Sequence, residues 1–218
     1  MSVGAVQATL AWQIGLVVVA YALGCLNTGY YLVRLKTGRD IRTIGSGNAG
    51  ARNVGRVLGR SGFVITLIGD LLKGVVAVLL AKLMQGTALT IALTSFAVVA
   101  GHLWPIQLGF RGGKGAASGC GAILALDPMS TGILLIACGL LRVFSGRSSL
   151  SAVVAFGLGP GVAYVLGRPV FVIAGYAGVA LLVIFSHVAN LKAEGAPPPE
   201  SAPDSIIRNN PSLPAGKR

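Results

Sequence analysis

The sequence predicts an all-α integral membrane protein: a seven-span helical bundle with its N-terminus outside and its C-terminus in the cytoplasm. Of its 218 residues, 54% are hydrophobic and only 11% are charged, and the mean hydropathy is +0.77. A soluble domain carries about 25% charged residues. Several uncharged runs approach the ~20 residues that a transmembrane helix needs. Basic residues are in addition concentrated in alternate connections, which predicts one orientation in the bilayer.

The spans are seven apolar segments, at residues 10–33, 63–83, 88–104, 115–126, 129–143, 149–166 and 170–190. The first has no basic residue before it, unlike a signal peptide, so we expect it to be retained. The fourth and fifth are short and meet at Asp127-Pro128, where proline cannot continue a helix. They are either two tilted spans or one broken re-entrant element. Glycines four residues apart, at Gly55/Gly59, Gly115/Gly119 and Gly157/Gly161, fit close helix packing.

Orientation follows from lysine and arginine. With seven spans, the connections on one side and the tail carry Arg34, Lys36, Arg39, Arg42, Arg52, Arg56, Arg60, Arg111, Lys114, Arg142, Arg147, Lys192, Arg208, Lys217 and Arg218. Lys82 and Arg168 fall on the other side. The excess marks the cytoplasmic side, and merging the fourth and fifth segments would weaken it. Residues 1–192 then form a membrane-embedded domain, and the proline-rich residues 193–218 form a disordered cytoplasmic tail.

The net charge of +12 does not indicate a nucleic-acid-binding protein, because no basic helix or aromatic-interleaved basic stretch is present. Anionic lipid headgroups and a phosphorylated substrate explain the charge better. Cys25, Cys120 and Cys138 lie inside apolar segments. With two histidines besides, no metal-ligand cluster is visible. We therefore expect no metal and no cofactor.

The first polar stretch that suits an anion is Gly45–Asn53, which Arg56 follows. Its glycines let backbone N–H groups converge on a negative group. Ser46, Asn48 and Asn53 add side-chain donors, Gly47 adds backbone freedom, and Arg56 offers a guanidinium for a bidentate contact. The alternative is a solvated loop built from turn residues.

The second stretch is Arg111-Gly112-Gly113-Lys114-Gly115, which leads into an apolar helix. Amides at a helix start point outward, the helix dipole is positive there, and lysine adds a charge, so the pattern suits phosphate. It is not a nucleotide P-loop, because Leu108 and Gly115 stand where that motif needs glycine and serine or threonine.

Histidines end two of the spans. His102 precedes Pro105, and His187 shares a helical face with Asn190, three residues later. A histidine is the first candidate for a general base near neutral pH, although an interfacial histidine is often only a structural hydrogen-bonding group.

Three further polar residues lie in or at the ends of spans. Asp70 and Lys73 lie inside the second span, where an unpaired charge costs about 3 kcal/mol, so they form either a structural pair or part of a site. Ser149 begins the sixth span, as a helix cap or as a ligand.

The ordered motifs resemble the bacterial acyl-phosphate:glycerol-3-phosphate acyltransferase family, PlsY. The resemblance rests on Gly45–Asn53 through Arg56, on Gly101–Pro105 with Gly109–Gly115, and on His187-Val188-Ala189-Asn190, with Asp70–Gly74 and Ser149-Leu150 in support. It covers roughly residues 20–192. Neither a Gly-x-Ser-x-Gly elbow nor the His-x4-Asp arrangement of the common glycerolipid acyltransferases is present.

The resemblance implies transfer of a fatty acyl group from acyl phosphate to the 1-hydroxyl of glycerol 3-phosphate. The implied catalytic residues are Ser46, Lys114, His187 and Asn190. The implied substrate-binding residues are Gly47, Asn48, Asn53, Arg56, His102, Arg111, Gly112, Gly113, Gly115 and Ser149. The implied location is the bacterial inner membrane, with the active site facing the cytoplasm. The implied partners are the two substrates, the lipid bilayer and the upstream enzyme that forms acyl phosphate.

Two other functions stay open. A transporter for phosphorylated solutes would also carry basic residues and glycine breaks, but transporters favour repeats with midplane sites, whereas these motifs share one surface. A catalytically inactive lipid-binding relative is the other possibility. It is suggested by Arg52, where the family usually has threonine, and by the shortened third motif.

Overall fold

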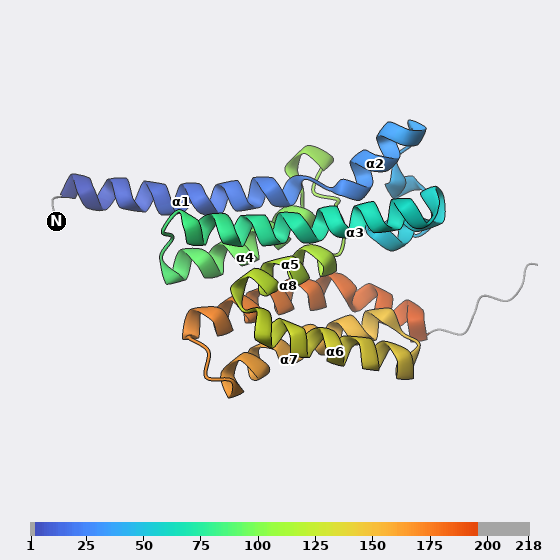
Figure 1. Cartoon of the computed structure of the whole chain (residues 1–218). Coiled ribbons are helices and arrows are strands. Elements are labelled where there is room, and N and C mark those ends of the chain that lie inside the picture. Colours follow the sequence, from blue (N-terminus) through green and yellow to red (C-terminus); the bar gives the residue numbers. More distant parts are fainter. Residues whose placement is uncertain (1–2, 196–218) are drawn as a thin grey trace, which may run out of the picture.

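The structure, a computed structural model, describes the backbone of residues 3–195 and the side chains of residues 9–188. All regular elements in that range are helices (Figure 1). The long helices are α1 (Val3–Cys25), α3 (Ala51–Leu83), α4 (Ala88–Leu103), α6 (Pro128–Ser145), α7 (Ser148–Val165) and α8 (Val170–Gly195). The shorter ones are α2 (Thr28–Thr37), α5 (Ala116–Leu126) and the 3-10 turns η1 (Ile41–Thr43) and η2 (Ile106–Leu108).

Six helical segments among the described residues are long and apolar enough to cross a membrane. The remaining predicted span is α5, which has 11 residues. It rises about 16 Å, roughly half the thickness of a bilayer's hydrocarbon core. The helical bundle is thus confirmed, and the count of seven spans stays a prediction. Helix α8 continues to Gly195, three residues into the predicted tail, and residues 196–218 lie outside the described range.

The first predicted span, 10–33, is wrong as one continuous helix. Helix α1 ends at Cys25, and α2 leaves it at an angle (Figure 1). The carbonyls freed by the break are satisfied from α3, because the Lys73 ammonium donates to Gly24 O (3.0 Å) and Leu26 O (2.8 Å). A buried lysine in the neighbouring helix therefore stabilises this interruption.

Helix α3 begins at Ala51, twelve residues before the predicted start of its span at residue 63. It bends at Gly59, whose φ of +72° and ψ of −165° are not helical. Glycine adopts this conformation at little steric cost, so Gly59 forms a kink between a short helical segment of about two turns and the long helix that follows. Those turns carry Arg52 and Arg56 to the end of the bundle where α2 lies (Figure 1).

The predicted break at Asp127-Pro128 is confirmed. The Asp127 carboxylate accepts hydrogen bonds from the N–H groups of Met129 (3.3 Å) and Ser130 (3.4 Å), and Pro128 opens α6. An ion pair of 2.8 Å joins Asp127 to Arg168, in the connection between α7 and α8. The α5–α6 junction therefore lies at the same end of the bundle as the α7–α8 connection.

Close packing of α3 on α5 depends on two glycines. A Cβ at Gly74 would lie 2.1 Å from Ser118 O, and one at Gly121 would lie 2.0 Å from Leu71 O. By contrast, a Cβ added at Gly59 or at Gly161, from the glycine pairs singled out by spacing, would meet no atom of a neighbouring segment within 4 Å. The packing prediction is wrong for these two, because spacing alone does not tell which face of a helix meets a neighbour.

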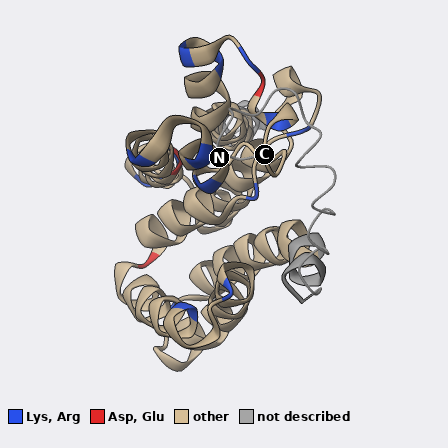
Figure 2. Cartoon of the chain, turned by 90° about the vertical axis from the view of Figure 1, so that its right-hand side faces the viewer, with Lys and Arg blue, Asp and Glu red and all other residues tan. Residues whose placement is uncertain are grey.

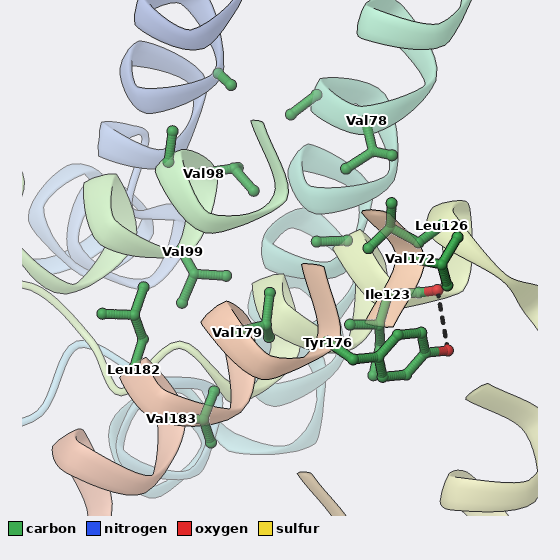
Figure 3. Close-up of a cluster of buried hydrophobic side chains, with 14 of the residues drawn as sticks. Val78, Val98, Val99, Ile123, Leu126, Val172, Tyr176, Val179, Leu182 and Val183 are labelled. Atoms are coloured by element: carbon green, nitrogen blue, oxygen red, sulfur yellow. Dashed lines mark hydrogen bonds between the residues drawn. The ribbon is translucent and has the colours of Figure 1, made fainter. Parts of the chain in front are cut away.

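The apolar core lies where α5 and α8 meet α3 and α4 (Figure 3). Val78, Val98 and Ile123 are buried there, against Val179 and Val183 of α8. Tyr176 is 1% exposed, and its hydroxyl donates to the carbonyls of Asp127 (3.0 Å) and Ile123 (3.5 Å). The core thus holds α5 between the α1–α3–α4 group and the α6–α7–α8 group (Figure 1).

Candidate active site

The first polar stretch is a loop organised around Asn53. Its side-chain amide faces the carbonyls of Ile41 (3.3 Å), Ile44 (2.8 Å) and Asn48 (3.1 Å), and its Oδ1 accepts the N–H of Ser46 (3.1 Å). Asn53 is 1% exposed. Its polar capacity is therefore directed at the loop's own backbone, and its position supports a role in shaping the site.

The other predicted residues of this loop lie at its surface. Ser46 and Gly47 are exposed, and Asn48 is half-buried. Gly47 has a φ of +68°, a conformation that glycine favours. Arg56 is exposed on the short segment of α3 before the bend. Ser46 and Asn48 thus lie in the loop, and Arg56 lies on the helical segment that follows it, with the side chains of Ser46 and Arg56 exposed.

Arg42 connects the first loop to the second, a function that sequence reasoning missed. Its guanidinium pairs with Asp40 (2.7 Å) and donates to Leu108 O (2.6 Å) and Arg111 O (3.3 Å). It also lies over the Tyr30 ring, 5.0 Å from the centroid. The hydrogen bond from Arg42 holds the pKa of Asp40 below its usual value, although partial burial opposes the shift. In the sequence, Arg42 contributed only to the predicted membrane orientation. In the structure it connects the chain before the first loop to the second loop.

The second loop folds back over the end of α4. Gly112 N–H donates to Leu103 O (2.9 Å), and Gly113 N–H donates to His102 O (3.1 Å). These two amides are therefore engaged within the protein. A Cβ at Gly113 would lie 2.1 Å from His102 Nε2. Both glycines are needed because His102 lies directly beneath them.

Three predicted residues continue this loop. Arg111 is exposed, Lys114 is half-buried, and Gly115 has a φ of +78° where it precedes the first turn of α5. The N–H groups of a first helical turn point out of the helix end, which attracts anions. The positive character expected of the glycine stretch therefore lies at Lys114 and the start of α5, slightly later than the two glycine amides.

The third motif meets the second through Ser186. Its hydroxyl donates to Lys114 O (2.7 Å) and lies 3.1 Å from His187 Nδ1. His187 is 1% exposed, and its Nδ1 is 2.8 Å from Val183 O. A carbonyl only accepts, so Nδ1 carries a proton, and the basic lone pair of the neutral ring is on Nε2. The side chain of Asn190 lies outside the described residues.

The start of α7 contacts the first loop. Arg52 donates through its guanidinium to the Ser148 hydroxyl, so the position that departs from the family pattern links the first loop to α7. Ser149, next in sequence, is fully buried in the first turn of α7. Viewed from this end of the bundle, lysine and arginine residues are spread over the loops and helix ends (Figure 2).

Behind the second loop lies a buried ionic cluster. Lys73 Nζ is 3.0 Å from Asp70 Oδ1 and 2.8 Å from His102 Nδ1. The three side chains are at most 8% exposed. His102, predicted to contact substrate, instead faces Lys73 with one ring nitrogen and Gly113 with the other. Its place is beneath the loop.

An apolar groove of about 340 Å³ begins at the first turn of α5. It runs between α3, α5, α6 and α7 and is lined by Leu67, Leu71, Ala116, Ala117, Cys120, Ile123, Thr131, Leu134, Leu135, Cys138, Ala152, Ala155 and Phe156. Ala116 lies two residues after Lys114 in the chain. A molecule with an anionic head and an apolar tail would thus find both surfaces side by side.

No group of three histidine, cysteine, aspartate or glutamate side chains within the described residues is placed to hold a metal ion. The chemistry that the arrangement can supply is charge stabilisation by Arg56 and Lys114, with proton exchange at His187. Arg42, three residues before the first stretch, donates to Arg111 O of the second, and Ser186, next to His187, donates to Lys114 O.

Comparisons with known proteins show the family of this chain. The model of the glycerol-3-phosphate acyltransferase family matches residues 14–194. A glycerol-3-phosphate acyltransferase of Geobacter metallireducens is 44% identical over 174 residues, which cover 79% of this chain and 89% of the relative. Glycerol-3-phosphate acyltransferase 1 of Desulfitobacterium hafniense is 43% identical over 177 residues, covering 79% and 86%.

A solved structure extends the likeness to three dimensions. The crystal structure of PlsY, an integral membrane glycerol 3-phosphate acyltransferase, in its glycerol 3-phosphate form superposes with a TM-score of 0.79 at 32% sequence identity. The match covers 84% of this chain and 91% of that one. The chain therefore belongs to the glycerol-3-phosphate acyltransferase family.

Proposed function

We propose that this chain transfers a fatty acyl group from acyl phosphate to the 1-hydroxyl of glycerol 3-phosphate, giving lysophosphatidic acid and inorganic phosphate. The observation that carries the proposal is the Arg111–Gly115 loop, which Arg42 and Ser186 tie to the chain beside the other two motifs and which leads into the apolar groove at the start of α5. The names of the relatives give the acceptor, and the PlsY structure was obtained with glycerol 3-phosphate.

Acyl phosphate fits the junction of loop and groove. Its phosphate would lie at Lys114 and the first turn of α5, where charge and helix dipole favour an anion. Its chain would enter from the lipid and lie in the groove, beginning at Ala116 and Ala117. The phosphate of the acceptor would lie on the first loop, at Ser46 and Arg56.

The reaction needs few protein groups, because acyl phosphate is already activated. The acceptor oxygen bonds to the acyl carbonyl carbon, and the bond between that carbon and the phosphate oxygen breaks. The hydroxyl proton passes either to His187 Nε2 or to the substrate's own phosphate. Lys114 and Arg56 neutralise the developing negative charge, and binding both substrates together removes much of the entropic barrier.

The site faces the cytoplasm in this proposal, in the inner membrane of a bacterium. In Figure 1 the N-terminus of α1 and the end of α8 lie at opposite ends of the bundle. Lys82 donates to the carbonyls of Ala125 (2.6 Å) and Leu126 (3.1 Å), which places the end of α5 beside the end of α3, away from the site. We propose that α5 is the seventh crossing, completed by the loop that precedes it.

The upstream enzyme that forms acyl phosphate is the expected partner.

The experiment is an assay of purified protein in liposomes with palmitoyl phosphate. We expect phosphate release that depends on glycerol 3-phosphate and yields lysophosphatidic acid. We expect Lys114→Ala to lower it on the order of 100-fold or more without lowering the yield of folded protein. Uptake of labelled glycerol 3-phosphate without acyl transfer would favour a transporter, and lipid binding without phosphate release would favour an inactive relative.

A further inference from the structure

The buried cluster beneath the second loop offers four acceptors to one ammonium group. Lys73 Nζ lies within 3.0 Å of Gly24 O, Leu26 O, Asp70 Oδ1 and His102 Nδ1. An ammonium carries three hydrogens and accepts none. Because an ammonium donates and never accepts, His102 Nδ1 at 2.8 Å meets Lys73 with its lone pair, whereas Asp70 Oδ1, 3.6 Å from the same nitrogen, lies beyond hydrogen-bond distance. The proton of the neutral ring is therefore on Nε2.

The protonated nitrogen is directed at the glycine loop. A Cβ at Gly113 would lie 2.1 Å from Nε2, so that ring atom packs against the backbone of Gly113. The His102 carbonyl accepts Gly113 N–H (3.1 Å) and the side-chain amide of Asn27 (3.2 Å). The position of the His102 ring thus determines where the backbone just before Lys114 lies.

We propose that Lys73 is a positioning residue, which fixes the proton of His102 on Nε2 and so holds the Gly112–Gly113 backbone in place for a substrate phosphate. Asp70 balances the ammonium charge within the bundle and is part of the same device. The inference rests on the proposed function, because it assigns the phosphate of acyl phosphate to the loop that His102 supports. The two histidines then have opposite roles. His102 presents an N–H to the loop, and His187 presents a basic nitrogen.

Nuclear magnetic resonance of protein labelled with ¹⁵N-histidine tests the tautomer directly. The chain has two histidines, and the His187→Gln variant assigns the signals. We expect the proton of His102 on Nε2 and that of His187 on Nδ1. The variant Asp70→Ala/Lys73→Met removes both charges together, because Lys73→Met alone leaves a buried carboxylate unpaired, which is strongly destabilising. In it, His102 should lose its single tautomer while His187 keeps its own.

Kinetics separate positioning from a merely structural role. Loss of a binding interaction raises KM and leaves kcat unchanged. We expect Asp70→Ala/Lys73→Met to raise the KM for palmitoyl phosphate about tenfold, with kcat changed less than about threefold. His102→Gln, which keeps an N–H donor, should preserve KM better than His102→Leu.

The matched control is Lys82→Met, which removes the other lysine of α3. Lys82 bonds two carbonyls at the far end of α5, so neither the His102 signals nor KM should change. A wild-type His102 protonated on Nδ1, or a variant with unaltered KM and an unaltered tautomer, would overturn the inference. Absence of acyl transfer in the wild type would refute the proposed function, and the resonance spectrum would still decide the tautomer.

Discussion

At the scale of single residues, the candidate site depends on side chains that shape loops as much as on those that meet substrate. Asn53 holds the first loop through four backbone contacts, and Arg42 joins that loop to the second through two carbonyls. Asn53 and Arg42 thus bond the protein's own backbone, and the proposed contacts with substrate are made by Ser46, Arg56 and Lys114.

The Asp40–Arg42 pair predicts a pH-dependent contribution to stability. The pKa of Asp40 is lowered in the folded protein, so the stabilisation is present above the unfolded pKa of about 3.9 and is lost as the pH falls through the folded value. We expect Arg42→Met to lower the free energy of unfolding by about 1 kcal/mol at pH 7. The difference from wild type should narrow below about pH 4.

Unfolding in detergent, followed by circular dichroism at both pH values, checks this. The neighbouring Arg39→Met is the control, since the Arg39 side chain is exposed and should matter little at either pH. A loss of stability that is equal at pH 7 and at low pH would show that the carbonyl contacts of Arg42, rather than Asp40, carry its contribution.

Residue roles were only partly predictable from the sequence. The composition of Gly45–Asn53, Arg111–Gly115 and His187–Asn190 indicated three motifs of one site, and in the structure Arg42 and Ser186, which flank the first and third, hydrogen-bond to the second. Asn53 was expected to meet substrate because it carries donors, and His102 because of the family resemblance, yet Asn53 faces the backbone of its own loop and His102 faces Lys73 and Gly113. Which way a polar side chain points depends on the tertiary neighbours of its helix, and the hydrogen bonds of Arg42 to residues 66 and 69 positions away have no local signature.

At the scale of helices, hydropathy predicted the positions of the spans well, because apolar length is a direct requirement of the bilayer. The bounds of α4, α5, α6 and α7 differ from expectation by at most two residues. The interruption after Cys25 was missed because Leu26-Asn27 lies in an apolar run without proline. Lys73 on another helix stabilises the interruption, a tertiary effect that a hydropathy plot does not contain.

Packing of α3 on α5 predicts a strong effect of one methyl group. Gly121→Ala places a Cβ about 2 Å from a backbone carbonyl of α3, so the helices must separate, at a cost of about 2 kcal/mol. Gly139→Ala in α6 meets nothing within 4 Å, and we expect it to be neutral or to stabilise by up to about 1 kcal/mol. Thermal unfolding of the two variants in the same detergent compares them. Equal melting temperatures would contradict the close approach.

The groove between α3, α5, α6 and α7 predicts an effect on chain-length preference. Ala152→Phe fills part of the groove, so turnover of palmitoyl phosphate should fall about tenfold or more while that of butyryl phosphate stays within about threefold, as loss of hydrophobic binding requires. Ile136→Phe on the lipid-facing side, where Ile136 is 67% exposed, is the control and should change neither. Equal losses with both substrates would argue that the acyl chain lies elsewhere.

At the scale of the whole molecule, the uneven distribution of lysine and arginine predicts the orientation. In a variant without the three native cysteines, a membrane-impermeant maleimide should label Met84→Cys in intact cells and Thr43→Cys only after permeabilisation. Met129→Cys and Phe110→Cys flank α5. If α5 crosses the bilayer, Met129→Cys should be labelled in intact cells and Phe110→Cys only after permeabilisation. Labelling of Met129→Cys and Phe110→Cys under one condition would exclude α5 as the seventh span.

The central claim is that stretches distant in sequence form one site for two phosphate-bearing substrates. The most direct measurement is the kcat/KM for palmitoyl phosphate of folded Lys114→Ala, His187→Ala and the double variant, at saturating glycerol 3-phosphate. Groups that act as a unit are far from additive, so we predict that each single variant loses on the order of 100-fold or more. The kcat/KM of the double variant should be only slightly lower than that of the less active single variant. Losses that simply multiply, or wild-type turnover in either single variant, would contradict a shared site.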